Sequence, residues 1–192
     1  MKLMKTRTIA IMMLLALVTL PLAGMTVVVD NHDGLVQYRA PGAARWETVS
    51  AGMEIIEGGT LVSGANGSAL LRAGNATIEV DPLSRLTVAQ ALFTDTSEST
   101  SLSMPYGRVR ASVRRSRERG MDFRVLTLIS TAAVRGTEFS FDGRVLAVQE
   151  GDVSFRNHLG QAHSVREGLL SRTWTETSIQ SVEETLADEL SF

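Results

Sequence analysis

Apolar and polar side chains alternate along most of this chain, from about Leu35 to Trp174. In one such stretch, Val109, Ala111 and Val113 alternate with arginine and serine. A period of two places successive side chains on opposite faces, which is typical of a β-strand with one buried and one solvated face. The pattern nowhere changes to strand, helix and strand in succession, so we do not expect a parallel α/β sheet.

Turn residues divide the alternating region into short segments. Glycine recurs at short intervals, and Asp142-Gly143 and Leu159-Gly160 have the composition of hairpin turns. Many short strands separated by turns are typical of antiparallel sandwiches, jelly rolls and related rolls. We therefore predict an all-β antiparallel sandwich or roll. The Ser/Thr-rich stretch from Asp95 to Ser101 is interpreted as an exposed loop.

The first 24 residues have the layout of a secretory signal peptide. A basic start is followed by the uncharged run Ile9 to Leu22 and then by the small residues Ala23 and Gly24. The alternative is an uncleaved anchor, because Ile9 to Val29 is 21 residues without a charge and is long enough to span a bilayer. In both cases a positive N-terminus stays inside and the remainder is exported. We predict an extracytoplasmic protein, periplasmic or secreted.

The C-terminal tail, residues 175–192, changes to a helical period. Its apolar residues are spaced for one face of a helix: Ile179, Val182, Leu186 and Leu190. Ser181 and Glu184 have the spacing of a capping box. We predict a short C-terminal helix that packs on the sheet or, as the alternative, binds a partner, while residues 34–174 form the β domain.

Composition and charge narrow the function classes. The chain of 192 residues has no cysteine, which excludes disulfides, thiol catalysis and metal sites built on cysteine. Three of its 19 basic residues, Lys2, Lys5 and Arg7, lie in the predicted leader. The other 16 are all arginine, and together with the 21 acids they give the rest of the chain a charge of −5. A nucleic-acid-binding domain is expected to be basic. We therefore expect no nucleic-acid partner, and membrane contact only through an uncleaved N-terminal segment.

The sequence contains no familiar catalytic or cofactor motif. H-E-x-x-H, G-x-S-x-G and the phosphate-binding glycine loops do not occur. The histidines His32, His158 and His163 do not have the spacing of metal ligands. We predict a protein that is not an enzyme and that has no cofactor or metal.

Arginines are concentrated in one short segment of the alternating region. The cluster consists of Arg108, Arg110, Arg114, Arg115, Arg117 and Arg119. On a strand, Arg108, Arg110 and Arg114 share one face. Guanidinium groups bind phosphate and carboxylate through paired hydrogen bonds, so the cluster is a candidate anion or partner site. The alternative is a solvated face whose charge is balanced by acids on a neighbouring strand, such as Asp122.

Residues 134–139 read V-R-G-T-E-F, and residues 148–153 read V-Q-E-G-D-V. Upstream, Trp46 is followed by Gly52, by Glu57-Gly58 and by Thr60 to Gly64. This pattern, from roughly Gly34 to Trp174, resembles the FecR domain, an extracytoplasmic module named after an iron-citrate signalling regulator. The residues that carry the family signature are Arg135, Gly136, Thr137, Phe139 and Gly151.

The resemblance implies a compact, jelly-roll-like all-β domain outside the cytoplasmic membrane. In the regulators that name the family, this domain follows a cytoplasmic anti-sigma segment and a membrane span, and together they relay the occupancy of an outer-membrane receptor to a sigma factor. About eight residues precede the apolar segment of this chain, and 18 residues follow Trp174. We therefore expect neither the sigma-binding segment nor the receptor-contacting C-terminal domain. A further departure is Leu128, where the family usually has proline.

Two functions are consistent with these observations. We predict an exported, non-catalytic binding or scaffold module of the cell envelope that engages a protein or an anionic glycan. The alternative is an accessory component of FecR-type cell-surface signal transduction, without its own sigma-binding domain.

The resemblance also raises the hypothesis that the chain cuts itself between Gly136 and Thr137. The threonine hydroxyl would attack the preceding carbonyl, and the acyl group would move from the amide nitrogen, which becomes a free amine, to the hydroxyl oxygen; the resulting ester hydrolyses more easily than an amide. We favour the alternative, in which Gly136 permits a bend, Thr137 and Phe139 share one face, and Arg135 makes a structural ion pair.

Overall fold

The structure is a computed structural model that describes residues 27–115, 120–173 and 179–181. Within these residues all regular structure is β, in two sheets of nine strands each. The prediction of an all-β fold is therefore confirmed. The described residues include no helix that could cross a membrane, and the predicted leader, residues 1–24, lies outside them.

Each sheet consists of strands from both halves of the chain. In spatial order, the first sheet contains β18 (Ile179–Ser181), β17 (Leu170–Thr173), β14 (Val145–Glu150), β13 (Glu138–Phe141), β10 (Val109–Val113), β7 (Ala76–Val80), β6 (Ser68–Ala73), β1 (Val27–Asp33) and β4 (Glu54–Ile55). The second sheet, also in spatial order, contains β16 (Ala162–Arg166), β15 (Asp152–Asn157), β12 (Ser130–Val134), β11 (Gly120–Leu126), β9 (Ser97–Tyr106), β8 (Arg85–Phe93), β5 (Thr60–Ser63), β2 (Val36–Arg39) and β3 (Glu47–Thr48).

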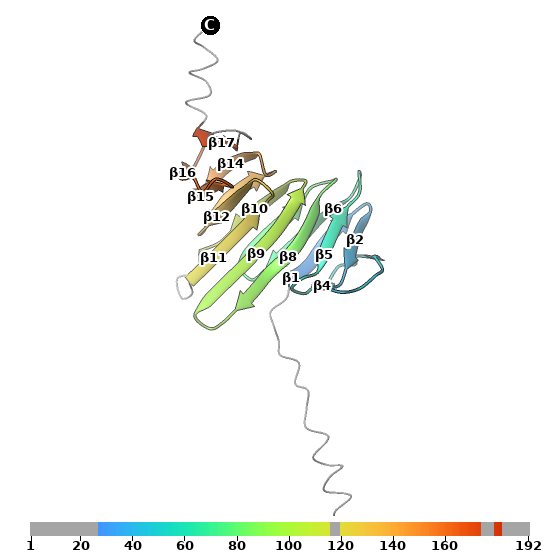
Figure 1. Cartoon of the computed structure of the whole chain (residues 1–192). Coiled ribbons are helices and arrows are strands. Elements are labelled where there is room, and N and C mark those ends of the chain that lie inside the picture. The colour runs from blue at the N-terminus through green and yellow to red at the C-terminus, as the bar shows by residue number, and fades with distance from the viewer. Residues whose placement is uncertain (1–26, 116–119, 174–178, 182–192) are drawn as a thin grey trace, which may run out of the picture.

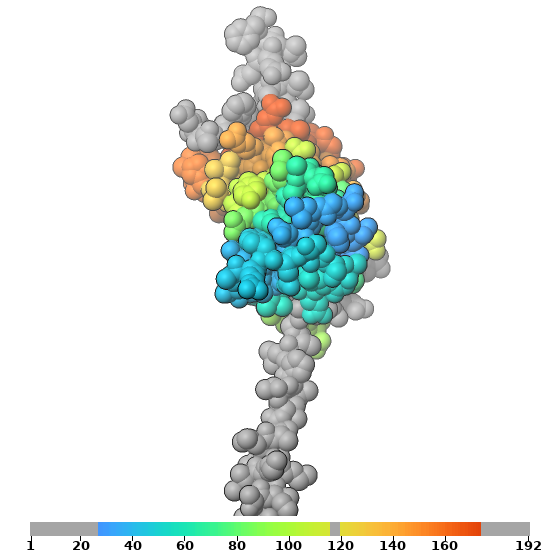
Figure 2. Space-filling model, turned by 90° about the vertical axis from the view of Figure 1, so that its right-hand side faces the viewer, coloured from blue at the N-terminus to red at the C-terminus, as the bar shows by residue number. Residues whose placement is uncertain are grey.

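The chain advances along the sandwich by placing strand pairs in the two sheets in turn. Hairpin β6–β7 lies in the first sheet, β8–β9 in the second, β13–β14 in the first and β15–β16 in the second. The colours in Figure 1 therefore run from blue strands at one end of the sandwich to orange and red strands at the other. The space-filling view of the N-terminal end shows the blue and cyan residues of the first strands gathered there (Figure 2).

One strand pair departs from the predicted antiparallel arrangement. Strands β9 and β11 pair in parallel, because β10 lies between them in sequence but belongs to the other sheet. A parallel pair needs such a crossover, since a tight turn reverses the chain. Apart from the short edge strands β3 and β4, which lie outside β2 and β1, the strand order follows the chain order along the sandwich, and the jelly-roll part of the prediction is not confirmed.

A single hydrophobic core fills the space between the sheets. Four phenylalanines join the two layers. Phe139 of β13 meets Phe123 of β11 with ring centroids 6.3 Å apart. Phe141 meets Phe155 of β15 at 5.6 Å, with the rings nearly perpendicular. Such edge-to-face pairs add to the stabilisation from burial alone, so the C-terminal half of the core ties the sheets together.

Both ends of the β domain differ from the sequence prediction. Strand β1 begins at Val27, and Val27 and Val29 are buried in the core, so the last residues of the predicted membrane span belong to a sheet. The described part of the predicted C-terminal helix is strand β18, which pairs with β17. Backbone N–H and C=O groups at the edge of a sheet are otherwise unpaired. Residues 179–181 pair with these groups of β17. The helix is not confirmed, and residues 182–192 lie outside the described part of the chain.

The stretch interpreted as an exposed loop is mostly strand. Only the turn before Ser97 is a loop, and β9 follows at once. Its inward positions include Glu98 and Thr100, which are buried. The Glu98 carboxylate accepts hydrogen bonds from the Asn75 side-chain amide at 2.9 and 3.0 Å. The inward face of β9 therefore begins with two polar residues. As a result, the start of the strand lacks the apolar–polar alternation by which strands are predicted from sequence.

Leu83 is a strained and exposed residue in the turn before β8. Its φ is 56°, a left-handed value that costs a non-glycine residue about 1–2 kcal/mol, and its side chain is 63% exposed. We expect Leu83→Asn to raise the stability by about 0.5–1 kcal/mol, because asparagine tolerates this backbone conformation and little packing is lost. Thermal unfolding measures the change. Leu128→Asn, at a 79% exposed position without a positive φ, is the control, and an equal shift in both variants would contradict the strain argument.

Candidate functional site

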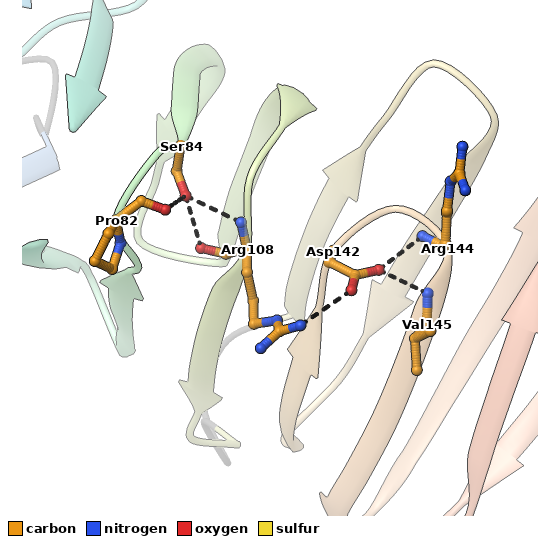
Figure 3. Close-up of polar contacts among 6 residues, drawn as sticks. All are labelled: Pro82, Ser84, Arg108, Asp142, Arg144 and Val145. Atoms are coloured by element: carbon orange, nitrogen blue, oxygen red, sulfur yellow. Dashed lines mark hydrogen bonds and ion pairs between the residues drawn. The ribbon is translucent and has the colours of Figure 1, made fainter. Parts of the chain in front are cut away.

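Arg108, the first arginine of the predicted cluster, is held at both its backbone and its side chain (Figure 3). Its N–H donates to the buried Ser84 hydroxyl at 3.0 Å. Its guanidinium lies 3.3 Å from Asp142 Oδ2. The other oxygen of Asp142 accepts the N–H groups of Arg144 and Val145 at 2.9 and 2.8 Å. The aspartate that begins the β13–β14 turn therefore also partners Arg108.

Arg110 faces solvent from the middle of β10 and is bound by two acids. Its Nη2 is 2.7 Å from Asp81 Oδ1 and 3.1 Å from Glu79 Oε1. Glu79 is its direct cross-strand neighbour on β7. The hydrogen bond to Asp81, followed by the charges of Asp81 and Glu79, raises the pKa of Arg110 above its usual value. Ion pairs as exposed as these contribute little stability, but they reduce the positive charge of this face.

The structure divides the predicted arginine cluster. Arg108 and Arg110 lie on the outer face of the first sheet, and Arg114 is exposed after the end of β10. Arg115 is turned toward the β12–β13 loop, where its Nε donates to a backbone carbonyl. Arg117 and Arg119 lie outside the described residues. An anion-binding role for the cluster stays a prediction.

Asp122, the acid named from the sequence, does not balance the arginines on the outer face of β10. Asp122 lies in the second sheet and pairs with Arg124 of its own strand, with Nε–Oδ1 at 3.0 Å. The balancing acids come from the first sheet instead, because β7 and the β13–β14 turn flank β10. The general interpretation of a balanced face therefore fits Arg108 and Arg110, whereas the choice of Asp122 is wrong.

The signature glycines make room for close contacts around the β12–β13 loop. Gly136 has a φ of 74°, and a Cβ there would lie 1.9 Å from Arg115 Cγ. Arg115 extends across this glycine, and its Nε donates to the Arg135 carbonyl at 3.0 Å. Gly151 has a φ of 85°, and a Cβ there would lie 2.8 Å from the Gly136 carbonyl oxygen. Side chains at either position would displace this packing.

Thr137, the proposed nucleophile of self-cleavage, is buried. Its hydroxyl donates to the Asp152 carbonyl at 3.0 Å. Its N–H donates to the Val113 carbonyl at 2.9 Å, and its own carbonyl accepts the Val113 N–H at 2.9 Å. Thr137 and Phe139, which were expected to share one face, are both buried, whereas the ion pair expected of Arg135 is not formed with any described residue. These hydrogen bonds give Thr137 a structural role in joining neighbouring segments, and self-cleavage stays a prediction.

A hollow of about 700 Å³ lies on the outer face of the second sheet, over β11, β12, β15 and β16. Its floor is formed by small side chains that are cross-strand neighbours: Ala133, Ser154 and Ser164. The charged residues that line it are Arg115, Arg124, Arg135, Arg156, Asp122 and Asp152. We call this feature the arginine hollow. A second hollow of about 660 Å³ adjoins it and shares Arg115, Asp122 and Arg135.

Sequence reasoning did not find Arg124 and Arg156 as site residues. Each alternates with buried neighbours on its own strand, which predicts an outward side chain. The sequence does not reveal that β12 lies between β11 and β15, and this pairing brings the two arginines to one hollow. No group of acidic residues and histidines in the described part of the chain is arranged to hold a metal ion.

Comparisons with known proteins agree with this architecture. Two crystal structures, at 1.65 and 2.50 Å resolution, are described as "a putative anti-sigma factor from Parabacteroides distasonis ATCC 8503". Each has a TM-score of 0.51 with this chain, at 15% and 14% sequence identity. The similarity covers 62% of this chain and 57% or 56% of those chains. This chain therefore spans little more than half of their length, and the likeness shows a shared fold.

No curated protein matches the chain. The model of the family described as "FecR protein" matches residues 59–154, which is half of the chain. The matched segment runs from the residue before β5 into β15 and includes the R-G-T-x-F signature with Gly136 against Arg115. The chain therefore belongs to the FecR protein family.

Proposed function

We propose that this chain is a non-catalytic component of FecR-type cell-surface signalling. The observation that carries the proposal is the family match over residues 59–154, the segment that forms most of the β sandwich. The fold shared with a protein described as a "putative anti-sigma factor" supports the same kind of function. Relatives of this kind are regulatory, which is the basis for a role without catalysis.

The proposal places the β domain outside the cytoplasm. Its basis is the sequence of the first 24 residues, with a basic start, an uncharged run and small residues at its end. The domain that follows starts at Val27 as a strand of the first sheet. In this arrangement the sandwich faces the envelope, where a FecR-type component would meet a receptor or regulator.

The other predicted function, a binding or scaffold module of the envelope, stays a prediction. Signalling has the more direct support, because the family match and the fold shared with a protein described as a "putative anti-sigma factor" both favour it. The two functions are compatible, since a signalling component must bind a partner. We propose an envelope protein as the partner that receives or transmits the signal.

Transcript levels in the native host test the signalling role. Deletion of the gene is expected to change a discrete set of transcripts several-fold, and the intact gene is expected to restore them. Complementation with Leu128→Ala, at a position that is 79% exposed, serves as the matched control and should restore them too. A transcript profile that is the same with and without the gene, under conditions in which the protein is made, would contradict the proposal.

A further inference from the structure

The arginine hollow carries more positive than negative charge. Four arginines and two aspartates line it, which leaves a formal charge of +2 in a chain with an overall charge of −2. Arg124 is neutralised by Asp122. Arg115, Arg135 and Arg156 have no ion pair with any described residue, unlike Arg108 and Arg110 on the first sheet. Unpaired guanidinium groups around one concave surface favour an anionic ligand.

The floor of the hollow supplies hydroxyl groups and space. Ala133, Ser154 and Ser164 are successive neighbours across β12, β15 and β16. Their short side chains leave the hollow open, whereas the larger residues stand around it. Thr131 adds a third hydroxyl beside Arg156, its cross-strand partner. A serine or threonine hydroxyl both donates and accepts hydrogen bonds, as the hydroxyl groups of a sugar do.

The position of the Arg115 guanidinium depends on the family signature. Its Nε donates to the Arg135 carbonyl at 3.0 Å, and its stem occupies the space above Gly136. Arg115 and Arg135 thereby come to the same rim of the hollow although they are 20 residues apart in sequence. The backbone contact orients Arg115 before any ligand binds, which reduces the entropy cost of binding.

The lining is a poor match to a protein partner. Anchors in protein interfaces are typically large aromatic side chains in addition to arginine, and no aromatic residue among the described residues lines the hollow. The hollow also lies on the face of four paired strands, so an incoming peptide cannot extend the sheet there.

We infer that the arginine hollow binds an anionic saccharide, a sugar chain that carries carboxylate, sulfate or phosphate groups. The arginines bind the anionic groups, and the serine and threonine hydroxyls bind the sugar hydroxyls. A volume of about 700 Å³ is within the usual range for ligand sites. This inference concerns binding by the purified chain, and it does not rest on the signalling role.

Calorimetric titration of the whole chain with oligogalacturonate and with sulfated dextran tests the inference. Neutral dextran is the uncharged control, and oligoglutamate represents an acidic protein segment. The variant Arg135→Gln with Arg156→Gln removes two charges from the hollow. The control variant is Arg72→Gln with Arg144→Gln, which removes one exposed charge from β6 and one from the β13–β14 turn. The hollow variant and the control variant therefore have the same net charge.

We expect at least one of the two anionic saccharides to bind, and neutral dextran not to bind. The hollow variant should lose at least about tenfold in affinity, because two charge-assisted contacts disappear, whereas the control variant should stay within about twofold. Affinity should also fall as ionic strength rises from about 0.01 to 0.15 M, since the screening length drops from about 30 to 8 Å. Circular dichroism of both variants checks that they are folded.

Four results would overturn the inference. The first is no binding of either anionic saccharide by the native chain. The second is an equal loss in the hollow and control variants. The third is tighter binding of oligoglutamate than of the saccharides, which would assign the hollow to an acidic protein segment. The fourth is a loss of binding in Arg108→Gln with Arg110→Gln and Arg114→Gln but not in the hollow variant, which would place the site on β10.

Discussion

Replacing Phe141 with alanine is expected to lower the free energy of unfolding by about 3–5 kcal/mol, the usual cost of emptying a large aromatic site in a core. Phe141 is fully buried on β13. Its ring meets Phe155 of the other sheet at 5.6 Å with an interplanar angle of 86°. The substitution therefore removes both buried apolar area and a contact between the layers. Urea unfolding followed by circular dichroism measures the loss.

Leu128→Ala is the matched control for this prediction. It also removes a large apolar side chain, but Leu128 is 79% exposed, so its change should stay within about 0.5 kcal/mol. A loss below about 1 kcal/mol for Phe141→Ala would contradict a core that joins the two sheets at this point.

Gly136→Ala is expected to lower the stability by about 2–3 kcal/mol, from two separate causes. The backbone has a φ of 74°, which costs an alanine about 1–2 kcal/mol. The new Cβ would lie 1.9 Å from Arg115 Cγ, so the arginine must move and give up its 3.0 Å hydrogen bond to the Arg135 carbonyl, worth about 1 kcal/mol.

Gly160→Ala separates the two causes. Gly160 has a φ of 82°, but no atom lies within 4 Å of a Cβ built there. It should lose only the backbone contribution, about 1–2 kcal/mol. Chemical denaturation of both variants gives the difference, and in an Arg115→Ala background, where the clash and the hydrogen bond are already absent, Gly136→Ala should cost only the backbone contribution. Equal losses in the two glycine variants would show that Arg115 does not pack on Gly136.

The strands were largely predictable because the core is built by local alternation. Val109, Ala111 and Val113 are all buried, as their period of two predicts. The Asp142-Gly143 turn joins β13 to β14 as expected. The start of β9 was not predictable, because its inward position 98 is a glutamate whose burial depends on the Asn75 amide from another hairpin.

The candidate site was less predictable than the fold, because it depends on which strands are neighbours. Arg110 was correctly placed on a solvated face, but its partners Glu79 and Asp81 come from β7 and the residue after it, about thirty positions upstream. The arginine hollow needs β11, β12, β15 and β16 side by side. Alternation determines which face a residue takes, and the pairing of distant strands determines what it meets there.

If this FecR-family chain acts in signalling from outside the cytoplasm, its activity depends on export. In a deletion strain, the measurement is the level of the deletion-responsive transcripts after expression of either the whole chain or the chain without residues 2–24, at equal protein amounts. We expect the whole chain to restore the transcripts and the chain without residues 2–24 to leave them unrestored. Restoration to the same level by the unexported chain would contradict signalling from outside the cytoplasm.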